Sequence, residues 1–230
     1  ASAFDLPSLL MTLDRYPYGC AEQTISRALP LLYVGELSAA TGLEDDPGLR
    51  ERVQAAIARV MTFQSSGGTF GLWGPGWGDF WLDSYVTDFL TRAREQGYEV
   101  PVQGFASALE NLQNQLSYTT DIQARGTEIA YALYVLARNR RASIGDLRYY
   151  ADTRLDEFSS PMARAQIAAA LALYGDGQRA ETVFASALQR AQATADDNFH
   201  RSDYGSTLRD GAAILALAAE TRPSPAIVPA

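Results

Sequence analysis

Two side chains of the segment YPYGCAEQT, which runs from Tyr16 to Thr24, could react with each other. Cys20 and Gln23 are three positions apart, and on a helical turn side chains at this spacing face each other at close range. A Cys20 thiolate can then attack the Gln23 side-chain carbonyl and expel ammonia, which leaves an internal thioester. The segment therefore predicts an activated acyl group built from the protein's own side chains.

The residues around this pair suit the same chemistry. Gly19 lets the backbone turn sharply just before the ring, and Pro17 stiffens the approach. Tyr16 and Tyr18 offer large apolar faces that can keep water away from a bond that would otherwise hydrolyse. Glu22 could orient the ring or cap the helix, and the sequence does not choose between these roles. The segment thus predicts a thioester that is shielded until it is needed.

The segment resembles the CxEQ thioester signature of the alpha-2-macroglobulin and complement family, most closely that of its bacterial members. The resemblance continues through GGTFGLWG and WLDSYVTDFL and the ordered helix pairs after them. It implies that the chain is the thioester domain of a longer protein, and that this domain is an α/α toroid.

The resemblance also implies a function, because members of this family are large protease traps. A protease cuts a bait region elsewhere in the chain, the assembly rearranges, and the thioester becomes exposed. A Lys amine of the protease then attacks the Gln23 carbonyl, giving an amide at Gln23 and a free thiol at Cys20. The cross-link forms once and without turnover, so the resemblance implies a trap rather than an enzyme.

Partners and location follow from the same resemblance. The implied partners are the target proteases and the neighbouring domains of the full-length chain, with no cofactor or metal ion. The bacterial relatives are periplasmic and often lipid-anchored to the inner membrane, and they serve in host defence. Any anchor would lie outside this segment, so we expect no direct membrane contact by this domain.

Some complement members use a His near the thioester to transfer the acyl group to hydroxyls. In family order this His falls between the Gly-aromatic loop and the next inner helix, and the corresponding stretch here, Gly71 to Asp83, contains none. The one His of the chain, His200, lies far along in DDNFHRSDYG, and we assign it no role. We therefore expect direct capture of amines and little ester formation.

Helical patterns dominate the rest of the chain, and runs of alternating β-branched residues are absent, so the predicted fold class is all-α. Asp46-Pro47 is a good helix start, and a short entry helix is expected after Pro7. The predicted main helices are Thr24–Thr41, Leu49–Gln64, Leu82–Gln96, Val102–Leu116, Thr127–Asn139, Gly145–Glu157, Pro161–Tyr174, Gln178–Thr194 and Ser206–Glu220.

These helices repeat loosely in pairs, with a period of roughly forty residues. The Ala-rich members, such as PMARAQIAAALALYGDG, predict an inner layer, and the Arg- and Glu-bearing ones, such as QRAETVFASALQRAQAT, an outer layer. About six such hairpins are expected to close into a ring of concentric helices, an α/α toroid. We place the thioester domain at residues 1–221 and read residues 222–230, which hold three Pro, as a linker toward a neighbouring domain.

One long segment breaks the helical pattern. Ser65 to Phe80, SSGGTFGLWGPGWGDF, is rich in Gly, which permits tight turns, and in aromatic residues. Trp73, Trp77 and Phe80 could cover an apolar patch. The segment is either a loop packed over the end of the helical barrel or a direct contributor to the chemistry, and both interpretations stay open.

Composition narrows the function classes. The formal net charge of −8 argues against a nucleic-acid binder, and the single Cys excludes an internal disulfide or a multi-cysteine zinc site. No apolar run approaches the length of a membrane helix. All 19 basic residues are Arg. Apart from its N-terminus, the chain therefore carries no primary amine of its own.

Two alternatives remain open. Toroids of this kind also house glycoside hydrolases and lyases, which use paired carboxylates. Several Asp residues lie near the predicted inner-helix starts, although N-capping is the commoner role for Asp there. The third interpretation is an inert interaction module in which Cys20 never reacts. The carboxylate candidates are Asp79, Asp83, Asp88, Asp203 and Asp210.

Overall fold

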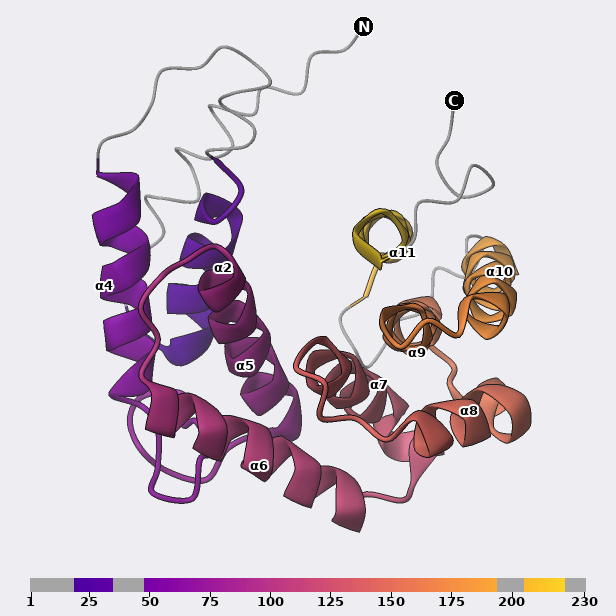
Figure 1. Cartoon of the computed structure of the whole chain (residues 1–230), viewed down its shortest axis with the longest axis horizontal. Coiled ribbons are helices and arrows are strands. Elements are labelled where there is room, and N and C mark those ends of the chain that lie inside the picture. Colours follow the sequence, from indigo (N-terminus) through magenta and orange to yellow (C-terminus); the bar gives the residue numbers. More distant parts are fainter. Residues whose placement is uncertain (1–18, 35–47, 194–204, 222–230) are drawn as a thin grey trace, which may run out of the picture. The chain divides into compact units, whose positions relative to one another are not determined.

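The computed structural model describes residues 19–34, 48–193 and 205–221. Within these residues the chain is helical, and the only strand-like pairing is an isolated bridge between Gln64 and Phe70. The described elements, labelled in Figure 1, are α2 (Ala21–Leu31), α4 (Leu49–Met61), α5 (Phe80–Glu95), α6 (Val102–Tyr118), α7 (Ile122–Arg138), α8 (Ile144–Thr153), the 3-10 helix η1 (Leu155–Glu157), α9 (Pro161–Leu173), α10 (Gly177–Ala193) and α11 (Thr207–Thr221).

The all-α prediction is confirmed, and most predicted helices end within a few residues of those observed. Three predicted helices differ from those observed. Helix α2 begins at Ala21 rather than Thr24, because the Cys20 side chain caps it, and it ends at Leu31 rather than Thr41, with Leu32 as its C-cap. Helix α7 begins at Ile122, capped by Asp121, and continues past a non-helical Arg125 with φ of −128°. The predicted helix up to Glu157 divides into α8 and η1.

The chain divides into two units, residues 1–111 and residues 112–230. In the first unit, α2 packs against α4 and α5. Helix α2 buries a single stripe at helical spacing, formed by Ala21, Ile25, Ala28 and Leu31, and α4 buries another. Such stripes are typical of helices that cover a neighbour on one side and meet solvent on the other.

Helix α5 is buried on all sides over most of its length, including its polar residues. Its inward hydroxyls are satisfied along the helix itself, because each one donates to the carbonyl four residues earlier. Ser84 donates to the Phe80 C=O at 2.9 Å, and Thr87 to the Asp83 C=O at 2.6 Å. Buried polar groups cost stability unless they are hydrogen-bonded, so α5 can serve as the central helix of this unit.

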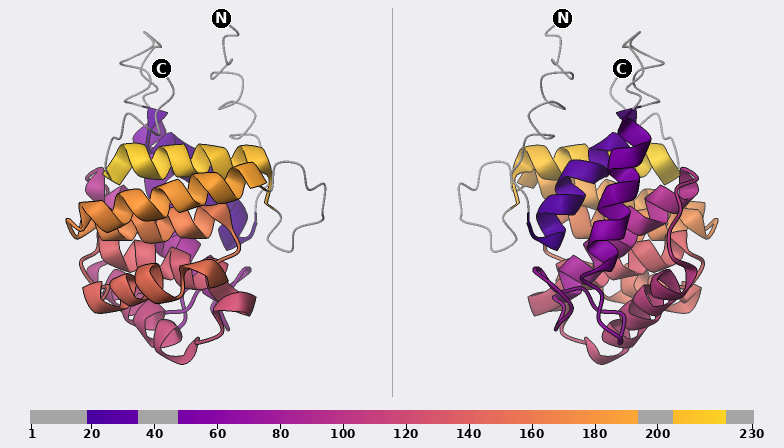
Figure 2. Two further views of the ribbon diagram at one scale, coloured as in Figure 1. Left: turned by 90° about the vertical axis from the view of Figure 1, so that its right-hand side faces the viewer. Right: turned by 90° about the vertical axis from the view of Figure 1, so that its left-hand side faces the viewer.

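In the second unit, α9 is the central helix and packs against α7, α8, α10 and α11. Helices α7 and α9 are buried nearly all round, whereas α8 and α10 bury only one stripe each. The ribbon views show α10 and α11 side by side (Figure 2). For these four helices, α7 to α10, the predicted division into inner Ala-rich and outer charged helices is confirmed.

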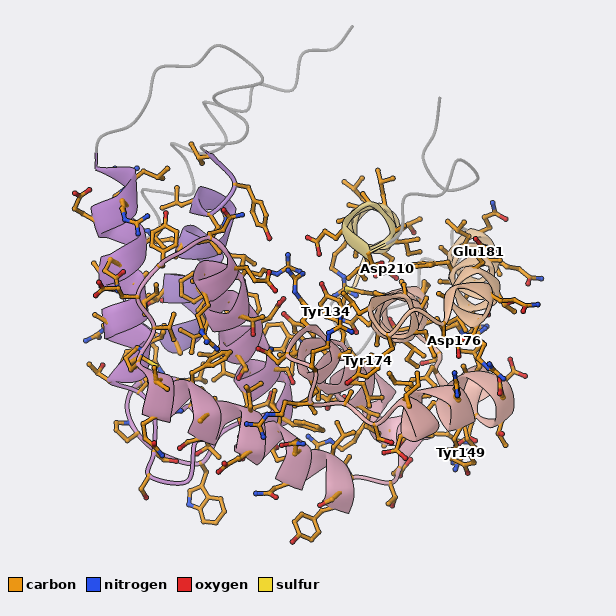
Figure 3. The ribbon with its side chains drawn as sticks, in the orientation of Figure 1. Tyr134, Tyr149, Tyr174, Asp176, Glu181 and Asp210 are labelled. Atoms are coloured by element: carbon orange, nitrogen blue, oxygen red, sulfur yellow. The ribbon has the colours of Figure 1, made fainter. Side chains whose placement is uncertain are left out.

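Helix α11 differs from the inner helix predicted for it. It buries only a stripe that includes Asp210 and Ile214, while Leu208 and Leu215 are exposed. Its link to α7 is polar: the Tyr134 hydroxyl donates to a Glu220 carboxylate oxygen at 3.0 Å (Tyr134 is labelled in Figure 3). Helix α11 is therefore less buried in the described structure than α7 and α9, the other Ala-rich helices of this unit.

Several predicted elements lie outside the described residues. These include the entry helix after Pro7, residues 35–41 of the helix predicted to reach Thr41, and the linker at residues 222–230. The domain boundaries at residues 1–221 and 222–230 therefore stay a prediction. None of the helices that the structure describes is long and apolar enough to cross a membrane.

Candidate functional site

Cys20 and Gln23 form a reciprocal cap at the start of α2. Cys20 is the N-cap residue, and the Gln23 backbone N–H points to Cys20 Sγ at 3.4 Å. In return, Gln23 Oε1 accepts from the Cys20 backbone N–H at 3.4 Å. This is a capping box in which sulfur replaces the usual hydroxyl oxygen. The thiol and the carboxamide therefore both fold back onto one turn of helix.

The turn that carries this pair is buried and held from outside the helix. Cys20 is 6% exposed, and Ala21 is fully buried. The Ala21 backbone N–H donates to the Leu72 C=O at 2.8 Å. An N–H in the first turn of a helix has no partner within the helix, so this bond satisfies one orphan donor and ties the Gly-rich loop to the reacting turn.

Trp73 lies against the backbone just before Cys20. A Cβ built on Gly19 would fall 2.6 Å from Trp73 Cζ3, a separation that no real side chain adopts. Gly at this position therefore permits an indole ring to rest on the turn. Trp73 is still 72% exposed, so its other face meets solvent. The loop therefore packs against the turn that carries Cys20, and its direct part in the chemistry stays a prediction.

The loop keeps this position through bonds of its own. The Thr69 hydroxyl donates to the Gly76 C=O at 2.8 Å, and Asp79 caps α5 by accepting from two backbone N–H groups. Trp77 is fully exposed and Phe80 is buried at the start of α5, so the predicted aromatic cover comes from Trp73 alone among the three residues named for it.

Glu22 does not cap the helix, since Cys20 does. Its carboxylate accepts from the Ser26 hydroxyl at 2.6 Å, and Ser26 Oγ also lies 3.1 Å from the hydroxyl of Tyr85 on α5. Burial raises the pKa of Tyr85 to about 12, with smaller contributions from the nearby Glu22 and Asp88 carboxylates. Glu22 is therefore the first member of a polar chain between α2 and α5.

A cavity of about 450 Å³ lies beside Gln23, between α2 and α4. Small apolar side chains such as Ala28 and Ala56 line part of it. Gln23 and Thr24 contribute polar groups, so the carboxamide lies at the wall of a space that another molecule can enter. The charged residues of the lining are all basic: Arg27, Arg52 and Arg59.

The structure leaves two sets of predicted residues unplaced. Tyr16 and Tyr18, expected to shield the bond, lie outside the described residues, as do His200 and Asp203. In the part of the chain that is described, no group of three or more His, Cys, Asp or Glu side chains is arranged to hold a metal ion.

The four described carboxylate candidates are each engaged by backbone or Arg groups. Asp79 is the N-cap of α5, and the buried Asp83 accepts from the Phe70 N–H and from Asn111. Asp88 lies in the middle of α5, not at a helix start as predicted, and pairs with Arg92 at 2.9 Å.

Asp210 faces α9 from α11 and pairs with Arg209 at 3.0 Å (Figure 3). None of these Asp residues lines the cavity beside Gln23. The described carboxylates therefore hold helices and loops in place, and they form no pair across a substrate space.

Sequence reasoning missed three contributors to the site: the Leu72 carbonyl, the Ser26–Tyr85 pair and the Arg residues of the cavity. Ser26 lies four residues after Glu22, a spacing that signals a contact on one helix face. Leu72 and Tyr85 meet α2 only through tertiary packing, and no local signal marks them.

Comparison with known proteins shows the family of the chain. The family model of the A-macroglobulin TED domain matches residues 3–128 of the chain. Alpha-2-macroglobulin of Escherichia coli strain K12 is 36% identical over 223 residues, which is 91% of this chain and 13% of that protein. The chain thus spans only a small part of this relative's length.

Solved structures show the same relation. The native conformation of E. coli alpha-2-macroglobulin matches 96% of this chain and 14% of its own, at 35% identity and a TM-score of 0.81. Salmonella alpha-2-macroglobulin reacted with methylamine matches 96% of this chain and 15% of its own, at 34% identity and a TM-score of 0.81. This likeness confirms the predicted fold class, the α/α toroid of thioester domains.

Proposed function

Because the chain belongs to the A-macroglobulin TED domain family, we propose that it is the thioester domain of a bacterial protease inhibitor of the alpha-2-macroglobulin type. The observation that carries the proposal is the reciprocal cap of Cys20 and Gln23 at the buried start of α2. It holds a thiol and a carboxamide on one turn, where a short ring between them can close.

Ring closure is an acyl transfer within the chain. Cys20 Sγ attacks Gln23 Cδ, the Sγ–Cδ bond forms and the Cδ–Nε2 bond breaks. Ammonia leaves and takes up the thiol proton, so the product is a thioester with no other change in the chain. Burial of Cys20 and the contact of Trp73 with Gly19 restrict the approach of water to the bond.

In the capture of a protease, the Cys20 sulfur is the leaving group and an amine is the nucleophile. A neutral amine of a protease Lys attacks Gln23 Cδ, the Cδ–Sγ bond breaks, and an amine proton passes to sulfur to regenerate the Cys20 thiol. The cavity beside Gln23 gives the amine a route of approach. Because its charged lining is basic, it favours the neutral amine, the form that can react, over the ammonium ion.

Mass spectrometry of the complete natural chain tests the proposal. An intact thioester makes the protein about 17 Da lighter than its sequence mass, since one ammonia is lost. Methylamine then adds about 31 Da and releases one titratable thiol. Two variants serve as controls. Cys20→Ser replaces the sulfur at the N-cap position by an oxygen, which is also a good cap, and Gln23→Glu reproduces the hydrolysed product. Both should fold like the wild type but show no mass deficit and no methylamine uptake.

Protease capture is the second measurement. After incubation with a protease, the expected product is a covalent complex that survives denaturation and contains an amide between Gln23 and a protease Lys. The same complex from the Cys20→Ser variant would contradict the proposal. A wild-type protein with neither mass deficit nor methylamine uptake would leave an inert interaction module, the third interpretation of the sequence.

Partners and location belong to the same proposal. Besides the protease, the domain contacts neighbouring domains of the full-length chain, which cover the thioester until the bait is cut. Resemblance to bacterial members supports a periplasmic site of action, with a lipid anchor supplied elsewhere in the protein. A protein that stays intact when protease is added to spheroplasts, as a cytoplasmic marker does, would contradict this location.

A further inference from the structure

We infer that Asp83 is a positioning residue for the thioester, because its buried carboxylate fixes the Gly-rich loop so that Leu72 and Trp73 stay on the turn that carries Cys20. The inference rests on the proposed function, since it concerns how long a thioester survives. Asp83 then acts through the loop, neither as a catalytic carboxylate nor as a charge that stabilises the start of a helix.

Asp83 holds the first end of the loop segment from Phe70 to Gly78. It lies in the first turn of α5 and is 1% exposed. Oδ1 accepts from the Phe70 backbone N–H at 2.6 Å, and Oδ2 accepts from Asn111 Nδ2 at 2.9 Å. A buried carboxylate is costly unless such donors satisfy it, and bonds to an ionised acceptor are the strong ones. Movement of Phe70 away from α5 would therefore leave a buried charge short of a donor.

The second end of the segment rests on the same carboxylate. A Cβ built on Gly78 would fall 2.6 Å from Asp83 Oδ1 and 2.7 Å from Oδ2, so the carboxylate occupies the space that a side chain at position 78 would take. Residues 70 and 78 thus meet one side chain. Leu72 and Trp73 lie between these two points, and the loop carries them on a segment held at both ends.

The contacts of this segment with α2 connect Asp83 to the reacting residues. Leu72 follows Phe70 by two residues, a reach of about 7 Å at full extension, so a shift of Phe70 is passed on to Leu72. The Leu72 carbonyl accepts from Ala21 at 2.8 Å, and the Trp73 ring lies on Gly19. Ala21 and Gly19 flank Cys20 on either side. Asp83 itself touches neither Cys20 nor Gln23 among the contacts of its carboxylate, so it acts through the loop.

The test removes and restores the bonds separately. Asp83→Asn keeps an oxygen for the Phe70 N–H but turns an amide donor toward the Asn111 donor, which breaks one bond. Adding Asn111→Asp returns an acceptor opposite the new donor, so D83N/N111D regains both bonds with the charge moved. Asp88→Asn is the matched control, because Asp88 is a buried carboxylate of the same helix that pairs with Arg92.

The measurements are made on the complete natural chain: the rate of spontaneous thioester hydrolysis by mass, the rate of methylamine uptake, and the thermal midpoint. Loss of one charged hydrogen bond is expected to speed hydrolysis and methylamine uptake about tenfold in D83N. The double variant should return to within about threefold of wild type. D88N should lower the thermal midpoint as D83N does but keep the wild-type reaction rates.

Three results would overturn the inference: wild-type rates in folded D83N, a double variant as fast as D83N, or a D88N variant as fast as D83N at the same thermal midpoint. If D83N does not fold, Gly78→Ala is the second variant, because its methyl group would displace the loop from both Asp83 oxygens, and its unchanged rate would overturn the inference as well. A wild-type protein without the mass deficit would instead refute the proposed function, so the two failures are distinguishable.

Discussion

At the scale of single residues, the contact between Gly19 and Trp73 decides how closely the indole ring approaches the reacting pair. The ring occupies the place that a side chain at position 19 would take. The aromatic ring and the burial of Cys20 would leave the proposed Sγ–Cδ bond with few directions of attack. Gly19 therefore contributes to shielding, because the lack of a Cβ lets the Trp73 ring lie against the turn.

Gly19→Ala tests this contact. The new methyl group would collide with the exposed Trp73 ring, which must move aside, and the φ of 157° at position 19 is one that residues with a Cβ rarely adopt. We expect a lower thermal midpoint and faster thioester hydrolysis, measured by differential scanning calorimetry and intact mass. Gly74→Ala in the same loop is the control, since a Cβ there would meet nothing within 4 Å.

The double variant G19A/W73A separates packing from shielding. Removal of the indole relieves the collision, so the thermal midpoint should recover part of its loss, whereas hydrolysis should stay fast because the cover is gone. A double variant that recovers the wild-type hydrolysis rate would show that Trp73 shields nothing.

At the scale of elements, α2 and α5 are joined by the hydroxyl contact between Ser26 and Tyr85. Burial holds the pKa of Tyr85 at about 12, above its value of ~10 in an unfolded chain. The phenol therefore loses its proton in the unfolded state first as pH rises. Its contribution to stability is complete below about pH 10 and is lost progressively as pH rises toward 12.

This titration predicts a steeper alkaline loss of stability in the wild-type chain than in Tyr85→Phe. Between about pH 9 and pH 11 the difference should reach on the order of 1 kcal/mol of unfolding free energy, measured by urea denaturation. Both chains carry Cys20→Ser, so thioester hydrolysis does not contribute. The titration of the other Tyr residues is common to both chains and cancels in the comparison. Parallel pH profiles for the two chains would contradict the raised pKa of Tyr85.

Most elements of this fold could be predicted from periodicity, because their apolar stripes and caps are local. The misplaced boundaries have physical reasons. The start of α2 was predicted late because sulfur is an unusual N-cap, and the pattern of apolar residues begins only after Cys20. The start of α7 was predicted late because Arg125 interrupts the helical geometry. The start of α5 was predicted late because Phe80 lies at the end of the Gly-aromatic segment.

The candidate site also has a part that could be predicted from the sequence and a part that could not. The spacing of Cys20 and Gln23 is local and could be read directly from the sequence. The bond from Ala21 to Leu72 joins residues about fifty positions apart, and the bonds of Asp83 to Phe70 and Asn111 exist only once the loop has folded onto α5. Such contacts depend on tertiary packing, which no periodicity encodes.

At the scale of the whole molecule, the lack of Lys and of a His between Gly71 and Asp83 should determine which nucleophiles can react. Its 230 residues contain no Lys, so they offer the proposed thioester no side-chain amine. The stretch from Gly71 to Asp83 also contains no His that could pass the acyl group to a hydroxyl. Without such a base, an alcohol remains protonated and reacts slowly with a thioester, whereas a neutral amine is already a good nucleophile.

The complete natural chain, activated by a protease, should therefore discriminate between nucleophiles. Methylamine should compete fully with capture of the protease, while glycerol at the same concentration should leave the yield of the covalent complex unchanged. The measurement is the fraction of cross-linked protease on denaturing gels, with the mass of the peptide that contains Gln23 to tell amide from ester. Placing His at position 73, 77 or 81, where Trp73, Trp77 and Trp81 now stand, is the gain-of-function comparison. Efficient glycerol ester formation by the wild-type chain would show that a base outside this stretch transfers the acyl group, and direct amine capture would then be wrong.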